Sequence, residues 1–497
     1  MQNLFMKDRS SRWGMLSMLL VLTLTSAAGA DPAGRRLPEL PRAAVSGERV
    51  TAPDGISGAE LIAFDGEVVT SLLKLNFGDS LAATAWPVAP GERVDVELMR
   101  FDVYAPDARI VKMEGDRQVD LPRSRLAFFH GRVPDDPGTR ILVSIDPETG
   151  VFEGFASSPD GIQELRPWTS AGKGQHLVAP SQAFQPAGAE PLGWSCGRDE
   201  VVARDKESEW LPALSDGGSR PTFTKAITTI HTASLAVDTD NELMSRKFSN
   251  NTTTATNYLA ALIASMNVMY ERDLRVRLVQ GFTVLRVSTT ADPYVQPCGS
   301  QVSDCSNGGG ASVPQLNEFT NYWAGGCGGA CTGVSRALVM MLSGKQSSTN
   351  SASGIAWIGG LCSTGTGYSF SQIFRSPGSS AASDSKLVGH ELGHNFGSDH
   401  THCYSPPIDV CFAGESNRGC HGGATSCPAP ATYNGVPNVT GTVMSYCHLT
   451  GCGSQEVFHT RSVELLAPII ESRVGICVFP TALFVNGFET GSTALWQ

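Results

Sequence analysis

The chain has 497 residues, of which 41% are hydrophobic and 17% charged, so it holds enough apolar material for two or three globular domains. The formal net charge of −11 and the lack of any Lys/Arg cluster in the sequence argue against a nucleic-acid partner, because phosphate binding relies on such clusters. Thirteen cysteines, most of them in the C-terminal half, favour an oxidising compartment.

Residues 1–30 have the three parts of a secretory signal peptide: basic residues up to Arg12, an apolar run from Met15 to Leu24, and small residues ending at Ala30. A membrane anchor is the alternative, but the apolar run is short for a bilayer, and no later segment has the roughly 18 apolar residues that a spanning helix needs. We therefore expect cleavage after Ala30, a secreted product and no membrane span.

Residues 31–167 are predicted to be β-rich, because short alternating segments are broken by turn signals such as Glu148-Thr149-Gly150. This region holds no cysteine and no cluster of metal-ligand residues. The next segment, up to about residue 221, is rich in Gly, Pro, Ala and Ser and is interpreted as a linker that carries Cys196.

A second domain is predicted from about Thr222. Its first segment, 224–240, alternates like a strand, and 253–274 places apolar residues at helical spacing. Residues 275–287, 333–344 and 353–362 are expected to be further strands, which gives a mixed α/β domain with long helices. Residues 401–477 are rich in Cys, Pro and Gly, so we expect a disulfide-rich C-terminal subdomain made largely of loops.

The sequence HELGHNFGSDH, residues 390–400, is the strongest functional signal. On a helix, His390 and His394 lie on one face with Cβ atoms about 5–6 Å apart, so both can reach one ion. Gly397 can adopt a positive φ and end the helix, so that His400 approaches from another direction. Three nitrogen ligands with an open position are typical of catalytic zinc, and Glu391 is placed to contact a metal-bound water. Three surface histidines are the alternative, which the spacing disfavours.

Asp384 or Ser383 is predicted to cap this helix, since both follow a Ser/Gly-rich segment.

The motif resembles the metzincin signature H-E-x-x-H-x-x-G-x-x-H, and the downstream GTVMSYCH resembles a metzincin Met-turn with Met444. The resemblance covers roughly residues 222–477 and implies a metzincin-like fold of mixed twisted sheet and long helices. It also implies a structural role for Gly397 and Met444. The strand and helix order and the Cys-rich end resemble reprolysins, but Thr401 stands where reprolysins usually have aspartate.

Astacins and serralysins carry a tyrosine two residues after the Met-turn methionine, and Tyr446 stands there in this chain. The resemblance implies that Tyr446 helps to stabilise the transition state; a packed or surface tyrosine is the alternative. His402 and His448 do not complete the motif's spacing, so we expect neither to be a ligand.

The resemblance implies one catalytic Zn²⁺ on His390, His394 and His400, which activates water for peptide hydrolysis with Glu391 as general base. In metzincins the substrate pairs with an edge strand, which the resemblance places at residues 353–362. A calcium ion is compatible with this family, but no residue pattern assigns its ligands. The expected partners are protein or peptide substrates, and the sequence does not fix the oligomeric state.

Cys196 precedes a domain whose twelve cysteines suffice for six disulfides. A thiolate is a good zinc ligand, so Cys196 is a candidate cysteine switch that fills the open zinc position in the latent form only. An incidental thiol or a disulfide to the second domain is the alternative. The close CxₙC spacings of the second domain are expected to be disulfides rather than structural zinc sites.

The expected order is therefore a signal peptide (1–30), a β-rich propeptide with linker that inhibits its own enzyme (31–200), a catalytic domain (201–477) and a C-terminal tail (478–497). The tail contains a GFE-x-G-x-T-x-x-W segment like those of secreted bacterial proteins, interpreted as a sorting tag or a plain terminal strand. Two other functions stay open: a catalytically silent adhesin or binding module on a metzincin scaffold, and a zinc hydrolase for a substrate other than peptide.

Overall fold

The computed structural model describes residues 42–44, 56, 58–115, 117–168, 174–184, 194–196, 229–296, 311–345, 352–374, 379–415 and 419–481. The expected signal peptide, residues 482–497 of the expected tail, and the cysteines at 298 and 305 lie outside these residues. Within the described residues, no helix is long and apolar enough to cross a membrane.

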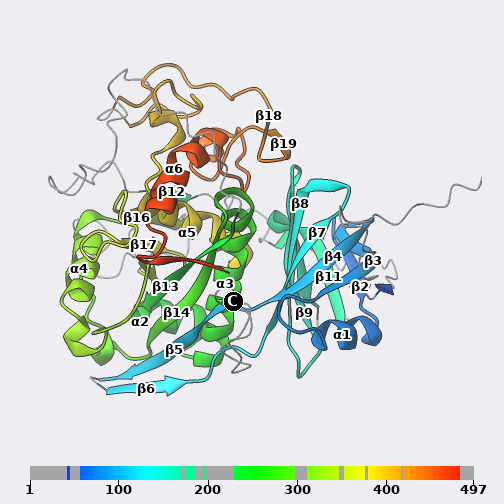
Figure 1. Cartoon of the computed structure of the whole chain (residues 1–497), viewed down its shortest axis with the longest axis horizontal. Helices are drawn as coiled ribbons and strands as arrows, with labels where there is room; N and C mark the ends of the chain where they lie inside the picture. The colour runs from blue at the N-terminus through cyan, green and yellow to red at the C-terminus, as the bar shows by residue number, and fades with distance from the viewer. Residues whose placement is uncertain are drawn as a thin grey trace, which may run out of the picture. The chain divides into compact units, whose positions relative to one another are not determined.

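The N-terminal region folds as a nine-stranded sheet in the order β1-β3-β4-β7-β8-β9-β10-β11-β2 (Figure 1). Neighbouring strands are antiparallel except for β1 and β3. The bounds are β1 Arg42–Ala44, β2 Glu60–Ala63, β3 Ser80–Ala89, β4 Glu92–Phe101, β7 Ala127–Val133, β8 Asp136–Ile145, β9 Phe152–Ser158, β10 Gly161–Pro167 and β11 Gln175–Pro180. The prediction of a β-rich region is confirmed.

This region has a hydrophobic core of its own. Helix α1 (Gly66–Leu73) begins at Asp65, whose carboxylate accepts a hydrogen bond from the Glu67 amide, and it buries Val68 and Leu72 against the sheet. Every residue of this core lies between Ile62 and Val178. The core therefore does not depend on the second half of the chain.

The second sheet runs β12-β16-β17-β15-β13-β14-β5-β6, and β20 pairs with β13. Parallel pairs join β13 to β14 and β15, β15 to β17, β14 to β5, and β12 to β16, whereas β16 and β17 are antiparallel. The bounds are β5 Tyr104–Glu114, β6 Arg117–Leu121, β12 Trp194–Cys196, β13 His231–Thr239, β14 Val276–Arg286, β15 Leu338–Ser343, β16 Ala352–Ala356, β17 Tyr368–Gln372 and β20 Val478–Pro480. The predicted mixed α/β fold of this part is confirmed.

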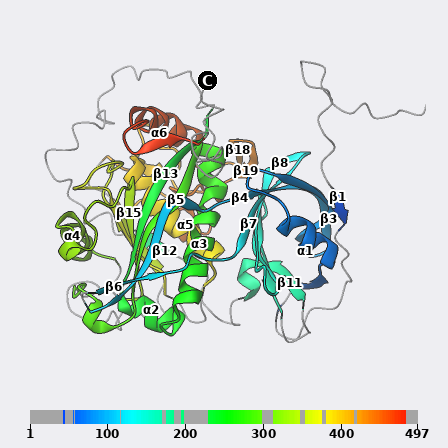
Figure 2. The same ribbon diagram turned by 60° about the horizontal axis from the view of Figure 1, so that its bottom comes forward.

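The second sheet includes strands from segments that were predicted to belong to the propeptide or to the C-terminal tail. Strands β5 and β6 come from the N-terminal region and continue the sheet beyond β14, as the cyan strands beside the green ones show (Figures 1 and 2). Strand β20 lies at the start of the expected tail. The expected boundary at residue 200 stays a prediction about processing, since the sheets themselves do not divide the chain there.

Helices cover both faces of the second sheet. Alternation along β13 sends Leu235 and Val237 into a core with α3 and α5, and sends Ala236 into a second core with α4. The helices are α2 Asn241–Phe248, α3 Thr252–Met269, α4 Val313–Ala324, α5 Ala381–Phe396 and α6 Thr460–Ser472. The predicted helix at 253–274 is confirmed as α3 with a π-helical turn after it, whereas α2, α4 and α6 were not predicted.

The predicted cap of α5 is wrong. The helix begins at Ala381, and the Ser380 hydroxyl accepts a hydrogen bond from the Ser383 amide at 3.1 Å. Asp384 lies inside the first turn, fully buried, and accepts hydrogen bonds from the Ser379 hydroxyl at 2.6 Å and from the Lys247 ammonium at 3.3 Å. Its carboxylate therefore anchors the helix start to α2 instead of capping it.

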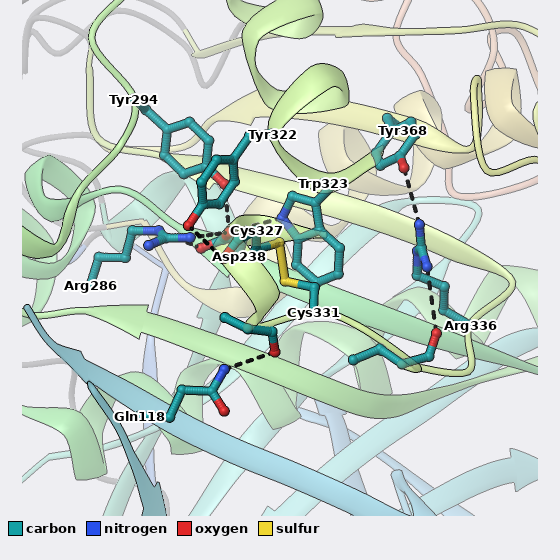
Figure 3. Close-up of a disulfide and its surroundings, with 12 residues drawn as sticks. Gln118, Asp238, Arg286, Tyr294, Tyr322, Trp323, Cys327, Cys331, Arg336 and Tyr368 are labelled. Carbon is teal, nitrogen blue, oxygen red and sulfur yellow. Dashed lines mark hydrogen bonds and ion pairs between the residues drawn. A yellow bond between two sulfur atoms is a disulfide. The ribbon is translucent and has the colours of Figure 1, made fainter. Parts of the chain in front are cut away.

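A buried ion pair fixes the α4 face of the sheet (Figure 3). The Arg286 guanidinium binds both Asp238 oxygens, at 2.9 and 2.8 Å, and the Trp323 indole N–H donates to the same carboxylate at 2.9 Å. The Cys327–Cys331 disulfide lies beside them. Because charges buried without partners are strongly destabilising, this network holds β13, β14 and α4 together.

Five disulfides are present among the described cysteines, and four of them lie in or bind the C-terminal part: Cys362–Cys477, Cys403–Cys420, Cys411–Cys447 and Cys427–Cys452. The disulfide interpretation of the close cysteine spacings is confirmed for these pairs.

Candidate metal centre

Helix α5 presents two imidazoles on one buried face. His390 and His394 are separated by one helical turn, and their Nε2 atoms are 3.1 Å apart. Asn395, which directly follows His394, donates to the carbonyl oxygens of Trp357 and Tyr368, both at 2.8 Å. These bonds attach the helix to the end of the second sheet and fix the direction of the two rings.

Gly397 ends α5 and turns the chain. Its φ is 116°, a left-handed conformation that L side chains rarely adopt, and its amide donates to carbonyls of the last turn. A Cβ at this position would lie 2.8 Å from Ile469 Cδ1. The turn brings His400 back, so that its Nε2 lies 3.2 Å from that of His390 and 3.1 Å from that of His394.

The other ring nitrogen of each histidine faces an oxygen acceptor. Nδ1 of His390 lies 2.7 Å from the Val443 carbonyl, and Nδ1 of His394 lies 2.8 Å from the Ser398 carbonyl. Nδ1 of His400 lies 2.7 Å from a carboxylate oxygen of Glu415. Each Nδ1 therefore donates, which leaves three Nε2 lone pairs pointing at one another.

This geometry fits a zinc ion. Three nitrogens that bind one ion at about 2.0–2.1 Å with tetrahedral angles are separated by about 3.3–3.4 Å, close to the observed 3.1–3.2 Å. Three converging acceptors have no proton to share, whereas one cation can bind all three lone pairs at once. The chemistry of the donor set and its burial both match a three-histidine metal site.

Glu391 lies beside this group and is fully buried. Burial raises the pKa of Glu391 well above its usual range, and the hydrogen bond from the Cys196 thiol partly opposes this rise. Its Oε1 has no hydrogen-bond partner within the described residues, whereas Oε2 lies 3.5 Å from Cys196 Sγ. A buried carboxyl group beside the three histidines can accept a proton from a molecule bound next to it.

Met444 packs directly against the histidine helix. A Cβ added to Gly393 would lie 2.5 Å from Met444 Sδ, so glycine at this position lets the methionine approach between the turns that carry the two helical histidines. Thr401 donates from both its amide and its hydroxyl to the Met444 carbonyl, at 3.1 and 3.3 Å. The residue that departs from the reprolysin pattern thus joins the third histidine to the Met-turn.

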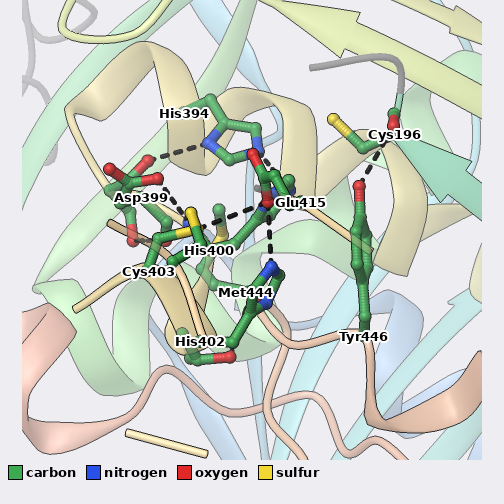
Figure 4. A network of polar contacts seen from close by, with 12 residues as sticks. Cys196, His394, Asp399, His400, His402, Cys403, Glu415, Met444 and Tyr446 are labelled. Carbon is green, nitrogen blue, oxygen red and sulfur yellow. Dashed lines mark hydrogen bonds and ion pairs between the residues drawn. A yellow bond between two sulfur atoms is a disulfide. The ribbon is translucent and has the colours of Figure 1, made fainter. Parts of the chain in front are cut away.

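Glu415 is a site residue that the sequence did not single out. One carboxylate oxygen accepts from His400 Nδ1 at 2.7 Å and from His402 Nε2 at 2.9 Å, and all three side chains are buried (Figure 4). Cys403, which also lies near, is in a disulfide with Cys420 and offers no thiolate. This second group is therefore a hydrogen-bonded support for His400.

Cys196, which precedes the peptidase domain in the chain, lies close to the three histidines. Its Sγ and the three imidazole nitrogens all lie within 4.8 Å of one another. Strand β12, which carries it, pairs with β16 in parallel, with Cys196 opposite Gly354. The Tyr446 hydroxyl donates to the Cys196 carbonyl at 3.0 Å, and its ring centroid lies 4.4 Å from that of His400 (Figure 4).

The expected substrate strand is shorter than predicted. Strand β16 ends at Ala356, and residues 357–362 form turns because Gly359 adopts a φ of 71° and its amide donates to the His394 carbonyl. A Cβ on Gly354 of this strand would lie 2.4 Å from a carboxylate oxygen of Glu391. The strand backbone therefore contacts the carboxylate directly, a closeness that the sequence did not reveal.

Comparison with known proteins bears on the second half of the chain. A reprolysin family profile, described as metallo-peptidase family M12, matches residues 230–446 of this chain, a range that includes the three histidines. No curated protein matches. One of the similar solved structures, titled "Structure of a chaperone-substrate complex", shares 16% identity over 48% of this chain and 35% of that chain, and its TM-score of 0.26 carries no structural argument.

Proposed function

Residues 230–446 make this chain a reprolysin-like metallopeptidase of family M12, and from that premise we propose that it is the latent precursor of a secreted zinc endopeptidase. One observation carries most of the weight. Three imidazole Nε2 atoms converge at 3.1–3.2 Å with every Nδ1 engaged by an oxygen, beside the buried Glu391 carboxylate, whose Oε1 has no hydrogen-bond partner in the described part of the chain. Export is supported by the composition of residues 1–30 and by the disulfides.

His390, His394 and His400 would hold the zinc ion. When bound, zinc supplies a Lewis acid that activates water and polarises the scissile carbonyl. Glu391 takes a proton from the attacking water and delivers it to the leaving amine, a role that its position beside the three histidines favours. Tyr446 is placed to donate a hydrogen bond to the oxyanion once the Cys196 carbonyl leaves its hydroxyl.

The substrate would add as an extended strand to β16, whose outer edge β12 covers in the latent chain. In that state Cys196 takes the position of the reacting groups: its thiol lies near the histidines and Glu391, and its carbonyl accepts from Tyr446. One short strand thus blocks the metal, the base and the substrate edge together.

A catalytically silent binding module on the same scaffold is the second candidate. A binding module does not need a general base. Burial of the Glu391 carboxyl group with no hydrogen-bond partner for Oε1 within the described residues costs free energy, and catalysis would explain why that cost is retained. A zinc hydrolase for another substrate would keep the same site, so the substrate test separates it from a peptidase.

The test compares casein cleavage by the activated protein, its Glu391→Gln variant and an exposed control, Glu464→Gln on α6. We expect Glu391→Gln to keep stoichiometric zinc by metal analysis while proteolysis falls by about 10²–10⁴-fold. A zinc chelator should abolish cleavage by the parent and the control. Cleavage by Glu391→Gln at the parental rate would refute the assigned base, and chelator-resistant cleavage would refute the zinc mechanism.

A further inference from the structure

The N-terminal region is built into the peptidase sheet, and this changes what a single proteolytic cut can do. We infer that residues 58–184 stay bound to the peptidase through β5 after one cut, and that latency ends only when the chain is cut on both sides of β12. The statement about latency rests on the proposed function, whereas the statement that residues 58–184 stay bound does not.

Strand β5 is a full member of the second sheet. It pairs in parallel with β14, from Arg109 opposite Phe282 to Met113 opposite Arg286, and the Gln280 amide donates to the Val103 carbonyl at 2.8 Å. Its other edge is paired with β6. Removal of the hairpin would therefore leave β14 with an unpaired edge, which sheet proteins avoid.

Apolar side chains from the hairpin complete the cores of the peptidase. Val111 and Met113 are buried in the same cluster as Phe282 and Val284 of β14. On the opposite face, Tyr104 and Ile110 of β5 are buried in the cluster that contains α3 and α5, together with Phe101 of β4 and Phe128 of β7. Separation of the two regions would expose these side chains to water, which opposes dissociation.

Polar contacts fix the position of the hairpin. The Gln118 side chain on β6 donates to the Ala330 carbonyl at 2.8 Å, in the loop closed by the Cys327–Cys331 disulfide (Figure 3). The Ser124 hydroxyl donates to Asn257 of α3 at 2.7 Å. Neither bond belongs to the separate core of the N-terminal region. That region also contacts the peptidase outside the hairpin, since His130 of β7 lies 3.6 Å from Glu271 and the Gln455 side chain donates to the Pro159 carbonyl. The hairpin adds a shared sheet edge to these contacts.

Strand β12 is held much less. It pairs with β16 over three residues, Trp194 to Cys196, and it is connected to η2 (Ser181–Phe184) on one side and to β13 on the other. A cut before β12 leaves it attached to the peptidase, and a cut after β12 leaves it attached to the N-terminal region. Because β5 keeps both regions together, β12 stays at an effective concentration in the millimolar range after either cut.

The test uses the full chain with recognition sequences for a site-specific protease inserted after Gly188, after Gly218, or at both positions, all outside the described residues. After each cut, native size-exclusion chromatography followed by a denaturing gel shows which fragments co-elute. Mass spectrometry shows whether the peptide that carries Cys196 is retained. Casein cleavage is measured on the same fractions.

We expect both large fragments to co-elute after every cut, the Cys196 peptide to be lost only after the double cut, and activity to rise at least about ten-fold over either single cut. Separation of the large fragments after the single cut at 218 would overturn the inference, and so would full activity after one cut. Co-elution with loss of the peptide but no proteolysis would support the statement that residues 58–184 stay bound and overturn the proposed function.

A second measurement assigns the binding to β5. In the chain with the site after Gly218, Val111→Asp should let the fragments separate after the cut, whereas Arg117→Ala, at an exposed position of the same hairpin, should not. Before cutting, both variants must elute as the parent does and give its circular dichroism spectrum. Co-elution of the cut Val111→Asp fragments would show that β5 is not the holding element.

Discussion

Replacement of Glu415 by glutamine should weaken zinc binding without unfolding the protein. Glutamine has nearly the same shape, so the change removes the charge and leaves one acceptor where the carboxylate has two. In the present structure one Glu415 oxygen accepts from His400 at 2.7 Å and from His402 at 2.9 Å, and the group is buried. In one orientation of the glutamine amide, its oxygen accepts from both histidines, but without the negative charge. In the other orientation, an amide N–H faces an imidazole N–H and the hydrogen bond is lost.

The magnitude follows from these bonds. A hydrogen bond to a charged group contributes about 1.5–3 kcal/mol, against about 0.5–1.5 kcal/mol for a neutral one, so the variant loses about 1–2 kcal/mol of support for His400. Since about 1.4 kcal/mol is tenfold in a binding constant, this agrees with the 10–100-fold losses of metal affinity that follow when a carboxylate behind a ligating histidine is removed.

The assay is competition for zinc between the full-length protein and a chromophoric chelator, with metal-free protein as the starting point. Glu464→Gln, an exposed glutamate on α6, is the matched control and should bind as the parent does. A thermal unfolding curve of the metal-free variant separates weaker metal binding from general instability. A dissociation constant for Glu415→Gln within twofold of the parental value would refute the reasoning.

Three further predictions concern the base, the latent state and acid stability. Gly354→Ala should lower kcat at least about ten-fold with zinc retained, because its methyl would displace the Glu391 carboxylate, whereas Gly66→Ala, which meets nothing within 4 Å, should not; equal rates would contradict this. Cys196→Ser should raise the casein-cleaving activity of the uncut chain, and a variant as latent as the parent would exclude the switch. His176 has a pKa lowered by burial from 6.5 to about 4, so the unfolded chain binds its proton at a higher pH than the folded chain does. The free energy of unfolding should therefore fall between pH 6.5 and 4, by about 2 kcal/mol at pH 5, and denaturant titrations of His176→Gln should show a smaller fall; an unchanged pH dependence would contradict this.

The elements that could be predicted are those whose residues carry a local periodic signal. Helix α3 has apolar residues at a spacing of three and four, and the strand at residues 231–239 has apolar residues at every second position from Ala233 to Val237. The histidine spacing likewise needs only helix geometry and one glycine turn, since residues 390–400 contain all the information for bringing three nitrogens together.

Residues that meet through tertiary structure escaped the same reasoning. Glu415 lies in a loop whose path depends on the Cys403–Cys420 disulfide, and no periodicity links it to His400. Ser380, and not Asp384, caps α5, because Asp384 has buried partners on α2 that a local pattern does not contain. The alternation in residues 104–114 indicates a strand, but alternation does not name the partner of a strand, so the sheet that β5 joins could not be predicted.

Strands β12 and β5 pair with opposite sides of the peptidase part of the second sheet, and this separates the proposed inhibition from the structural support. Strand β12 lies at the β16 edge with three paired residues and places Cys196 over the histidines, whereas β5 lies at the β14 edge and buries apolar side chains in two cores. An inhibitory strand has to dissociate before the peptidase becomes active. Strand β12 makes a weak contact and stays close only through the chain on either side of it, so it is easily lost once both connections are cut. Strand β5 completes the sheet and has to stay bound, and its buried apolar side chains oppose its dissociation. Under the proposed function, the same region would keep the peptidase latent and would still complete its sheet after activation.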